Sequence, residues 1–147
     1  MQPMNATVKL AGKDYELRFD VLSLTSAQSL MKGLGYKREN VWSLADTPYD
    51  LGEEIILVQQ GINGAKRLAK DKSGMTVEEV QELFQEHFDY IAEKIQGIED
   101  EKEAMQAFQD EHNNIMKSIG DAVRSGIGFR RAAVKGGSRR KADRVDA

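Results

Sequence analysis

Apolar and polar residues alternate along residues 6–19 of the chain, with a glycine near the middle of the stretch. A period of two interrupted by glycine predicts a two-stranded antiparallel hairpin. A turn at Gly12 and Lys13 has glycine first, as type II′ turns require. The facing pairs would then be Leu10 with Tyr15, Val8 with Leu17, Ala6 with Phe19, and Lys9 with Glu16. An isolated hairpin is marginally stable, so its apolar side must lie against helices or another subunit.

Residues 23–35 have apolar positions at helical spacing and predict a short helix. We expect this helix to be the first element that covers the apolar side of the hairpin. Its cap would be Ser23, Thr25 or Ser26. The expected buried positions are Leu24, Ala27, Met31 and Leu34. Asn40 then predicts the cap of a single turn that places Trp42 and Leu44 in the core.

Residues 46–64 predict the central helix, because they are apolar nearly all round. Its cap would be Asp46 or Thr47, with Pro48 at the first helical position, where the missing N–H costs nothing. The glycines of residues 61–64 predict its end, followed by a basic, exposed connector.

The clearest helix start in the sequence is at Thr76. Thr76 and Glu79 have the spacing of a capping box, and Met75 and Val80 have that of a hydrophobic staple. Side chains that are apolar except at Lys102 and His112 then recur at steps of four or three along residues 84–122, the spacing of a heptad seam.

Gly97 leaves two interpretations of this seam open. Either one helix ends there and Asp100 caps a second helix that folds back, or a single long helix runs through the glycine. A glycine inside a helix costs only about 1 kcal/mol, which tertiary packing can outweigh. Glycine followed by an acidic cluster indicates the end of one helix and the start of the next, so we favour a break or bend near Gly97. The glycines after Val123 predict the end of the last helix.

Composition indicates a soluble protein of single-domain size, with 147 residues, 40% hydrophobic and 31% charged. No apolar run approaches the roughly 20 residues that cross a bilayer, and we expect neither a signal peptide nor membrane association. The absence of cysteine excludes disulfides, thiolate nucleophiles and cysteine zinc sites. These features suit the cytoplasm.

Charge is unevenly distributed along the chain, although its net value is only -3. Residues 78–111 hold twelve Asp or Glu against two lysines. Residues 130–147 carry seven basic side chains against two aspartates, and we expect them to form a disordered, flexible tail. The basic residues are Arg130, Arg131, Lys135, Arg139, Arg140, Lys141 and Arg144.

Neither histidine belongs to a recognisable catalytic or metal-binding set. His87 and His112 both lie in predicted helices, and their separation matches no familiar ligand motif. The glycine-rich residues 61–66 lack the Gly-Lys-Ser/Thr ending of a phosphate loop. Acidic pairs such as Glu53 and Glu54 are adjacent on a helix and do not face each other. We therefore expect no enzymatic activity, cofactor or metal.

The heptad seam is the main candidate for a functional surface. In one interpretation its side chains are intramolecular core. In the other, the seam exceeds what one small domain can bury, and the surplus docks a helical partner or a second subunit. The candidate partner-binding residues are Phe84, Phe88, Ile91, Ile95, Met105, Phe108, Ile115 and Ile119. The alternative function is that of a small cytoplasmic nucleic-acid-associated protein acting through its basic tail, although nucleic acid is the less favoured partner because no aromatic residue follows Phe129.

A series of motifs resembles the tail assembly chaperones of long-tailed bacteriophages. They are "VKLAGKDYELRFD", a short helix with Ala27 and Leu30, a Trp/Leu turn, a helix entered through "DTPYDL", and "MTVEEVQELF". The likeness covers roughly residues 6–90, and the order and spacing of the motifs carry it.

The resemblance implies a non-enzymatic protein of the infected bacterial cytoplasm that is absent from the mature virion. Members of this family bind the long, helical tape measure protein and keep it soluble until tail tube subunits polymerise around it. In several members a frameshifted extension is thought to recruit the tube protein. Some members form rings or spirals, so a homo-oligomer is a further expectation.

The predicted fold is α+β and mainly helical, with an N-terminal antiparallel hairpin. One domain is expected over residues 1–129, with the hairpin at 6–19 and helices within 23–125. The basic tail follows at residues 130–147.

Overall fold

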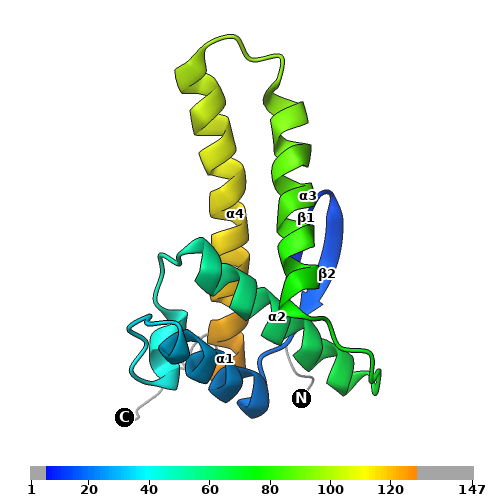
Figure 1. The fold of residues 1–147 in the computed structure, drawn as a ribbon, viewed down its shortest axis with the longest axis vertical. Helices are drawn as coiled ribbons and strands as arrows, with labels where there is room; N and C mark the ends of the chain where they lie inside the picture. Colours follow the sequence, from blue (N-terminus) through cyan, green and yellow to red (C-terminus); the bar gives the residue numbers. More distant parts are fainter. Residues whose placement is uncertain (1–5, 129–147) are drawn as a thin grey trace, which may run out of the picture.

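The chain folds into a helical base from which the far ends of two long helices project, as a computed structural model shows (Figure 1). The structure describes residues 6–128, so the predicted basic tail lies outside the described residues. The elements are β1 (Ala6–Leu10), β2 (Lys13–Leu17), α1 (Val21–Gly33), the 3₁₀ helix η1 (Val41–Ala45), α2 (Leu51–Leu68), α3 (Val77–Ile95) and α4 (Glu101–Ile127). This order confirms the predicted fold class, mainly helical with an N-terminal antiparallel hairpin.

The hairpin turns one residue earlier than the sequence pattern predicts. Ala11 and Gly12 form the turn, with φ angles of 52° and 79°. Two positive φ angles are the backbone of a type I′ turn. Val8 faces Tyr15, so the predicted turn at Gly12 and Lys13 and its register are wrong. The observed pairing is shifted by two residues from the predicted one. Because side chains alternate between the two faces of a strand, a shift of two leaves each apolar side chain on the predicted face.

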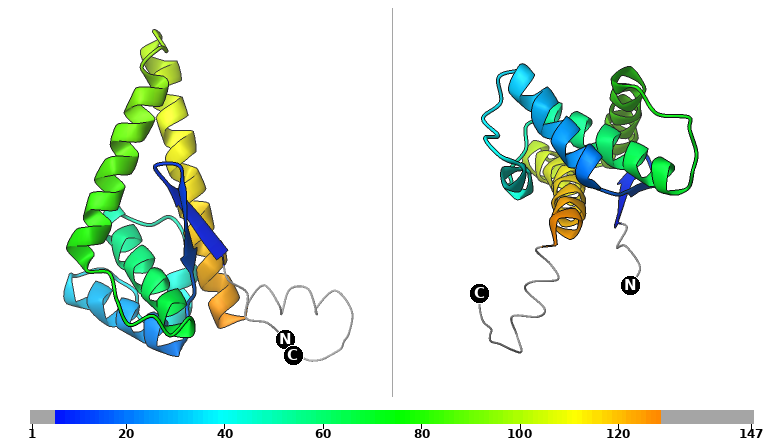
Figure 2. Two further views of the ribbon diagram at one scale, coloured as in Figure 1. Left: turned by 90° about the vertical axis from the view of Figure 1, so that its right-hand side faces the viewer. Right: turned by 90° about the horizontal axis from the view of Figure 1, so that it is seen from below.

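The apolar side of the hairpin rests on α2, α3 and α4 (Figure 2). Strand β2 packs on α2, whereas β1 packs on α4 and α3. Val8, Leu10 and Leu17 are at most 1% exposed as a result. Helix α1 packs mainly on α2, so the expectation that it is the first cover of the hairpin is wrong.

The segment from α1 to η1 leaves apolar side chains exposed that the sequence pattern places in the core. Helix α1 begins earlier than predicted because Asp20 caps it, with its carboxylate accepting a hydrogen bond from the Ser23 backbone N–H. Leu34, at the end of the predicted buried stripe, is 68% exposed. Asn40 caps η1 as predicted, but Trp42 within η1 is 57% exposed.

A buried arginine organises the loop between α1 and α2. The Nε of Arg38 donates to Glu53 Oε2 at 2.7 Å, and its Nη2 donates to Glu53 Oε1 at 3.2 Å. The same guanidinium also donates to the backbone carbonyls of Ser43, Asp46 and Pro48. Burial alone would raise the pKa of Glu53, but the bond from Arg38 holds it below its ordinary value, so the pair is ionised at neutral pH.

Helix α2 starts later and ends later than predicted. Asp50 is its N-cap, and the Asp50 backbone N–H donates to Glu53 Oε1 at 3.0 Å. The helix continues through Gly61 and Gly64, which were expected to end it. A Cβ at Gly64 would overlap the backbone carbonyl oxygen of Arg18. These glycines therefore permit the chain after β2 to lie directly on α2, where the Arg18 N–H donates to the Gly61 carbonyl at 2.9 Å.

The seam after Thr76 forms two antiparallel helices with a break at Gly97 (Figure 1). Thr76 caps α3, and the reciprocal bonds with Glu79 confirm the predicted capping box. Helix α3 ends before Gly97, and Asp100 caps α4, which confirms the favoured interpretation. Helix α4 ends at Gly128, whose φ is 84°. No helix within residues 6–128 has the length and apolar character needed to cross a membrane.

Candidate protein-binding surface

The distal parts of α3 and α4, with the segment that joins them, form an arm at residues 88–112. Figures 1 and 2 show that its far end extends beyond the hairpin, α1 and α2. Near the base of the arm, His112 still meets Glu54 of α2 and Tyr90 lies beside Gly12 of the hairpin turn, but the side chains of residues 92–110 are all exposed or half-buried. The arm therefore offers more accessible surface per residue than the base.

The candidate partner-binding residues divide between core and surface. Phe84, Ile91, Ile115 and Ile119 are at most 2% exposed. The core interpretation of the seam is therefore correct for these four side chains. Phe88, Ile95 and Phe108 are half-buried, and Met105 is 67% exposed. Only these last four can touch a partner without separation of the helices.

Aromatic side chains join the two helices of the arm near its base. The Phe88 ring lies 5.6 Å from the Phe108 ring and 6.2 Å from the His112 ring, measured between centroids. It also meets Phe84 edge-on at 6.4 Å. Aromatic pairs at these separations contribute to stability beyond their buried area. Phe88 is therefore a structural side chain, and an acidic substitution there would open the arm.

Charge surrounds the apolar part of the arm. Lys94 on α3 and Glu111 on α4 form an ion pair, with 3.0 Å between Nζ and Oε2. Exposed acidic side chains flank the far end, namely Glu93, Glu99, Asp100, Glu101 and Glu103. This charge favours a basic partner and suppresses indiscriminate apolar association.

Four exposed apolar side chains, not predicted as exposed from the sequence, lie along α1 and at its C-cap. We call Val21, Leu22, Leu30 and Leu34 the α1 face; their exposed fractions are 76%, 54%, 43% and 68%. The signal was present in the sequence, because residues 21–34 hold more apolar positions than one helix face can bury. Steps of eight and four place the three leucines on one side of the helix.

A buried carboxyl group faces a histidine where α2 meets α4. The Glu54 side chain is fully buried, and its Oε2 lies 3.2 Å from His112 Nε2. Burial, followed by the charge of Glu53, raises the pKa of Glu54 to about 8. Burial lowers the pKa of His112. The pair is therefore neutral at pH 7, with a protonated carboxyl beside a neutral imidazole.

Replacing Glu54 with glutamine is expected to remove a pH dependence from the stability of the fold. Because folding raises the pKa of Glu54 from 4.5 to about 8, its contribution is complete below pH 4.5 and disappears as the pH rises to about 8. The free energy of unfolding of Glu54→Gln, relative to that of the parent, should therefore increase by up to about 1.4 kcal/mol for each pH unit between pH 4.5 and about 8. Because His112 Nε2 lies 3.2 Å from Glu54 Oε2, the same comparison in a His112→Asn background separates the titration of the carboxyl group from that of the imidazole.

Urea unfolding of both proteins at a series of pH values measures this difference. Glu82→Gln, at an exposed position on α3, is the matched control and should follow the parent at every pH. A difference between Glu54→Gln and the parent that does not change with pH would show that Glu54 is ionised in the folded protein.

The described residues offer no metal centre, because no group of three or more His, Asp or Glu side chains within residues 6–128 is placed to hold an ion. His87 and His112 both face the packed interior between the helices, as Phe88 does. Comparison of the chain with protein-family models, curated proteins and solved structures found no match.

Proposed function

We propose that the protein is a tail assembly chaperone of a long-tailed bacteriophage, which binds the helical tape measure protein and keeps it soluble in the host cytoplasm. The observation that carries the proposal is the exposure of the α1 face and of Met105 in a protein that already has a filled core. The order of motifs along residues 6–90 supports the choice of family.

The chemistry of these surfaces suits a helical, apolar client. An amphipathic helix presents side chains at steps of three and four, which match leucines spaced along one side of α1. Met105 adds an unbranched side chain that adapts to different partners. The role requires only reversible burial of client side chains, and no catalytic step. A longer form that recruits the tail tube protein, and assembly of several copies, belong to the same proposal.

Acidic substitution on the exposed surfaces is expected to abolish client binding while the fold is kept. In Leu30→Glu/Leu34→Glu, two leucines are lost from the contact, and each is worth about 1.5 kcal/mol or more when buried. Affinity should therefore fall at least about 100-fold. Met105→Asp tests the arm in the same way. The assay is co-expression with the product of a tape measure gene found near this one, followed by co-purification and measurement of soluble client.

Matched controls separate loss of binding from loss of folding. Ser29→Glu on α1 and Gln109→Asp on α4 each place one negative charge at an exposed polar position and should bind the client as the parent does. Circular dichroism and thermal unfolding report whether each variant is folded. Unchanged client binding by folded Leu30→Glu/Leu34→Glu and Met105→Asp would overturn the proposed surfaces. A genome without a tape measure gene near this one would overturn the proposed family.

A further inference from the structure

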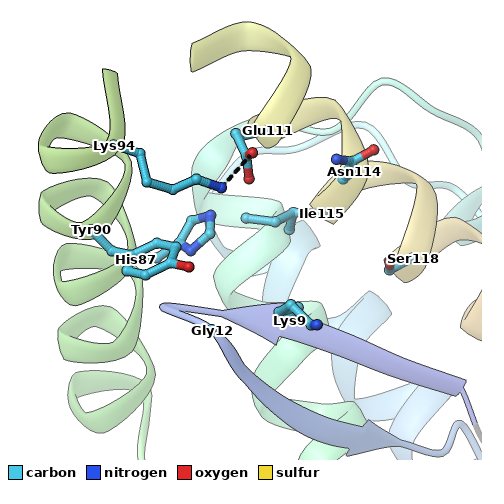
Figure 3. Close-up of a pocket in the computed structure, with 9 residues that line it drawn as sticks. All are labelled: Lys9, Gly12, His87, Tyr90, Lys94, Glu111, Asn114, Ile115 and Ser118. Carbon is cyan, nitrogen blue, oxygen red and sulfur yellow. Dashed lines mark hydrogen bonds and ion pairs between the residues drawn. The ribbon is translucent and has the colours of Figure 1, made fainter. Parts of the chain in front are cut away.

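A small pocket lies where the hairpin turn meets α3 and α4, and the proposed function does not use it. Its volume is about 140 Å³. Figure 3 shows Gly12 of the turn on one side, His87 and Lys94 from α3 on another, and Glu111 and Asn114 from α4 opposite them. Lys9 of β1, Tyr90 of α3, and Ile115 and Ser118 of α4 also line the pocket. The hairpin, α3 and α4 thus bring polar groups together in one pocket that opens to solvent.

His87 supplies a buried hydrogen-bond donor to this pocket. The side chain is 3% exposed, and its Nδ1 accepts a hydrogen bond from the Ala11 backbone N–H at 2.8 Å. A ring nitrogen that accepts carries no proton, so the neutral imidazole must be protonated at Nε2. Burial lowers the pKa of His87 and so favours this neutral form. Within residues 6–128 the Nε2 atom has no hydrogen-bond partner, although buried polar groups normally have one.

The charges around the pocket favour a bound anion. Lys94 and Lys9 contribute two ammonium groups, and Asn114 contributes an amide. The one carboxylate in the lining, Glu111, is already paired with Lys94 at 3.0 Å. Lys9 has only a loose partner, with 4.0 Å between its Nζ and the carboxylate of Asp14. The lining is therefore rich in donors and carries a net positive charge.

We propose that this pocket binds a single carboxylate group, with the exposed Lys94 side chain moving aside so that the covered His87 Nε2–H donates to one oxygen while Lys94 lies near the other. The small volume suits one planar group, and the negative charge of Glu111 disfavours a dianion such as phosphate. The carboxylate belongs to a free small acid or to an acidic side chain of a partner protein. A bound water would satisfy Nε2–H as well, but it would not need the two lysines.

Nuclear magnetic resonance of the imidazole rings tests the proposal directly, because the chain contains only two histidines. Addition of acetate at constant ionic strength is expected to shift the His87 Nε2 signal with saturation at millimolar concentration. The His112 signal should not move. A blocked glutamate residue, N-acetylglutamate amide, tests the side-chain source; if it binds more tightly than acetate, the carboxylate belongs to a partner protein. Inorganic phosphate should bind more weakly than either.

Variants distinguish a carboxylate site from a water site. His87→Asn keeps an acceptor close to the position of Nδ1 but removes Nε2–H, and Lys94→Gln removes one cation. In both variants the Ala11 and Gly12 backbone amide signals should no longer respond to acetate. Lys117→Gln, which removes an exposed lysine on α4 that pairs with Asp121, should respond as the parent does. Absence of a saturable His87 shift in the parent, or an equal response of the parent and Lys94→Gln, would overturn the proposal.

Discussion

Replacing Arg38 with alanine is expected to lower the free energy of unfolding by about 3–5 kcal/mol. The side chain is 9% exposed and donates five hydrogen bonds, two of them to Glu53. Its removal leaves the Glu53 carboxylate buried and unpaired, and three backbone carbonyls lose their donor. Urea unfolding followed by circular dichroism measures the loss.

Two further variants identify the cause of this effect. Arg38→Lys keeps the charge but cannot reproduce the two-pronged contact with Glu53, so it should recover only part of the stability. Lys117→Ala removes an exposed pair with Asp121 and should cost less than about 0.5 kcal/mol. If Arg38→Ala costs no more than Lys117→Ala, the loop between α1 and α2 does not depend on the arginine.

Replacing Gly64 with alanine is expected to destabilise the protein by about 3 kcal/mol or more. The usual effect of this change inside a helix is a gain of about 1 kcal/mol, because alanine is the better helix former. At Gly64 the new Cβ would overlap the Arg18 carbonyl oxygen and come within 2.7 Å of Ser23 Oγ. The first of these atoms belongs to the backbone and cannot rotate away. Residues 18–23 would have to leave α2.

Gly33→Ala is the matched control for this prediction. Gly33 is also a helical glycine, but nothing lies within 4 Å of the position that its Cβ would take. That variant should be as stable as the parent or slightly more stable, as thermal unfolding of the two variants side by side will show. Equal stability of Gly33→Ala and Gly64→Ala would mean that the segment after β2 does not lie against α2 in solution.

Local sequence signals predicted those elements whose boundaries are set by neighbouring residues. The capping box of Thr76 and Glu79 and the cap of η1 at Asn40 follow from short-range hydrogen bonds, and both predictions are confirmed. The break at Gly97 is confirmed for the same reason, since Asp100 lies close enough to cap the next helix. The hydrophobic pattern also identified which face of the hairpin is apolar.

Errors arose where distant residues decide the local conformation. The hairpin turn places Ala11 at a positive φ, and the N–H of Ala11 is bonded to His87, which lies 76 positions further along the chain. Gly61 and Gly64 were expected to end a helix, but they are the positions where another segment crosses it. The network of Arg38 joins loop carbonyls that no sequence spacing brings together.

The candidate surface was predicted in part. The periodic seam correctly identified two facing helices, but periodicity alone does not separate core positions such as Ile119 from exposed ones such as Met105. The distinction depends on how far the base extends along the arm. The α1 face was missed because Leu34 was expected to be buried with the stripe of its helix, and no prediction was made for Val21, Leu22 or Leu30 as a surface. The pocket at His87 could not be predicted, since it requires the docked position of the hairpin turn.

The close approach of backbone segments at Gly64 has an evolutionary consequence. Gly126 on α4 is in a similar position, because a Cβ there would overlap the carbonyl oxygen of Phe19. Both sites lie where the chain leaves the hairpin, and neither tolerates a side chain of any kind. Distant relatives that keep this architecture must therefore conserve glycine at these two positions even when every surface residue has changed. A glycine near the end of α2 together with a glycine near the end of α4 is thus a signature by which such relatives can be recognised.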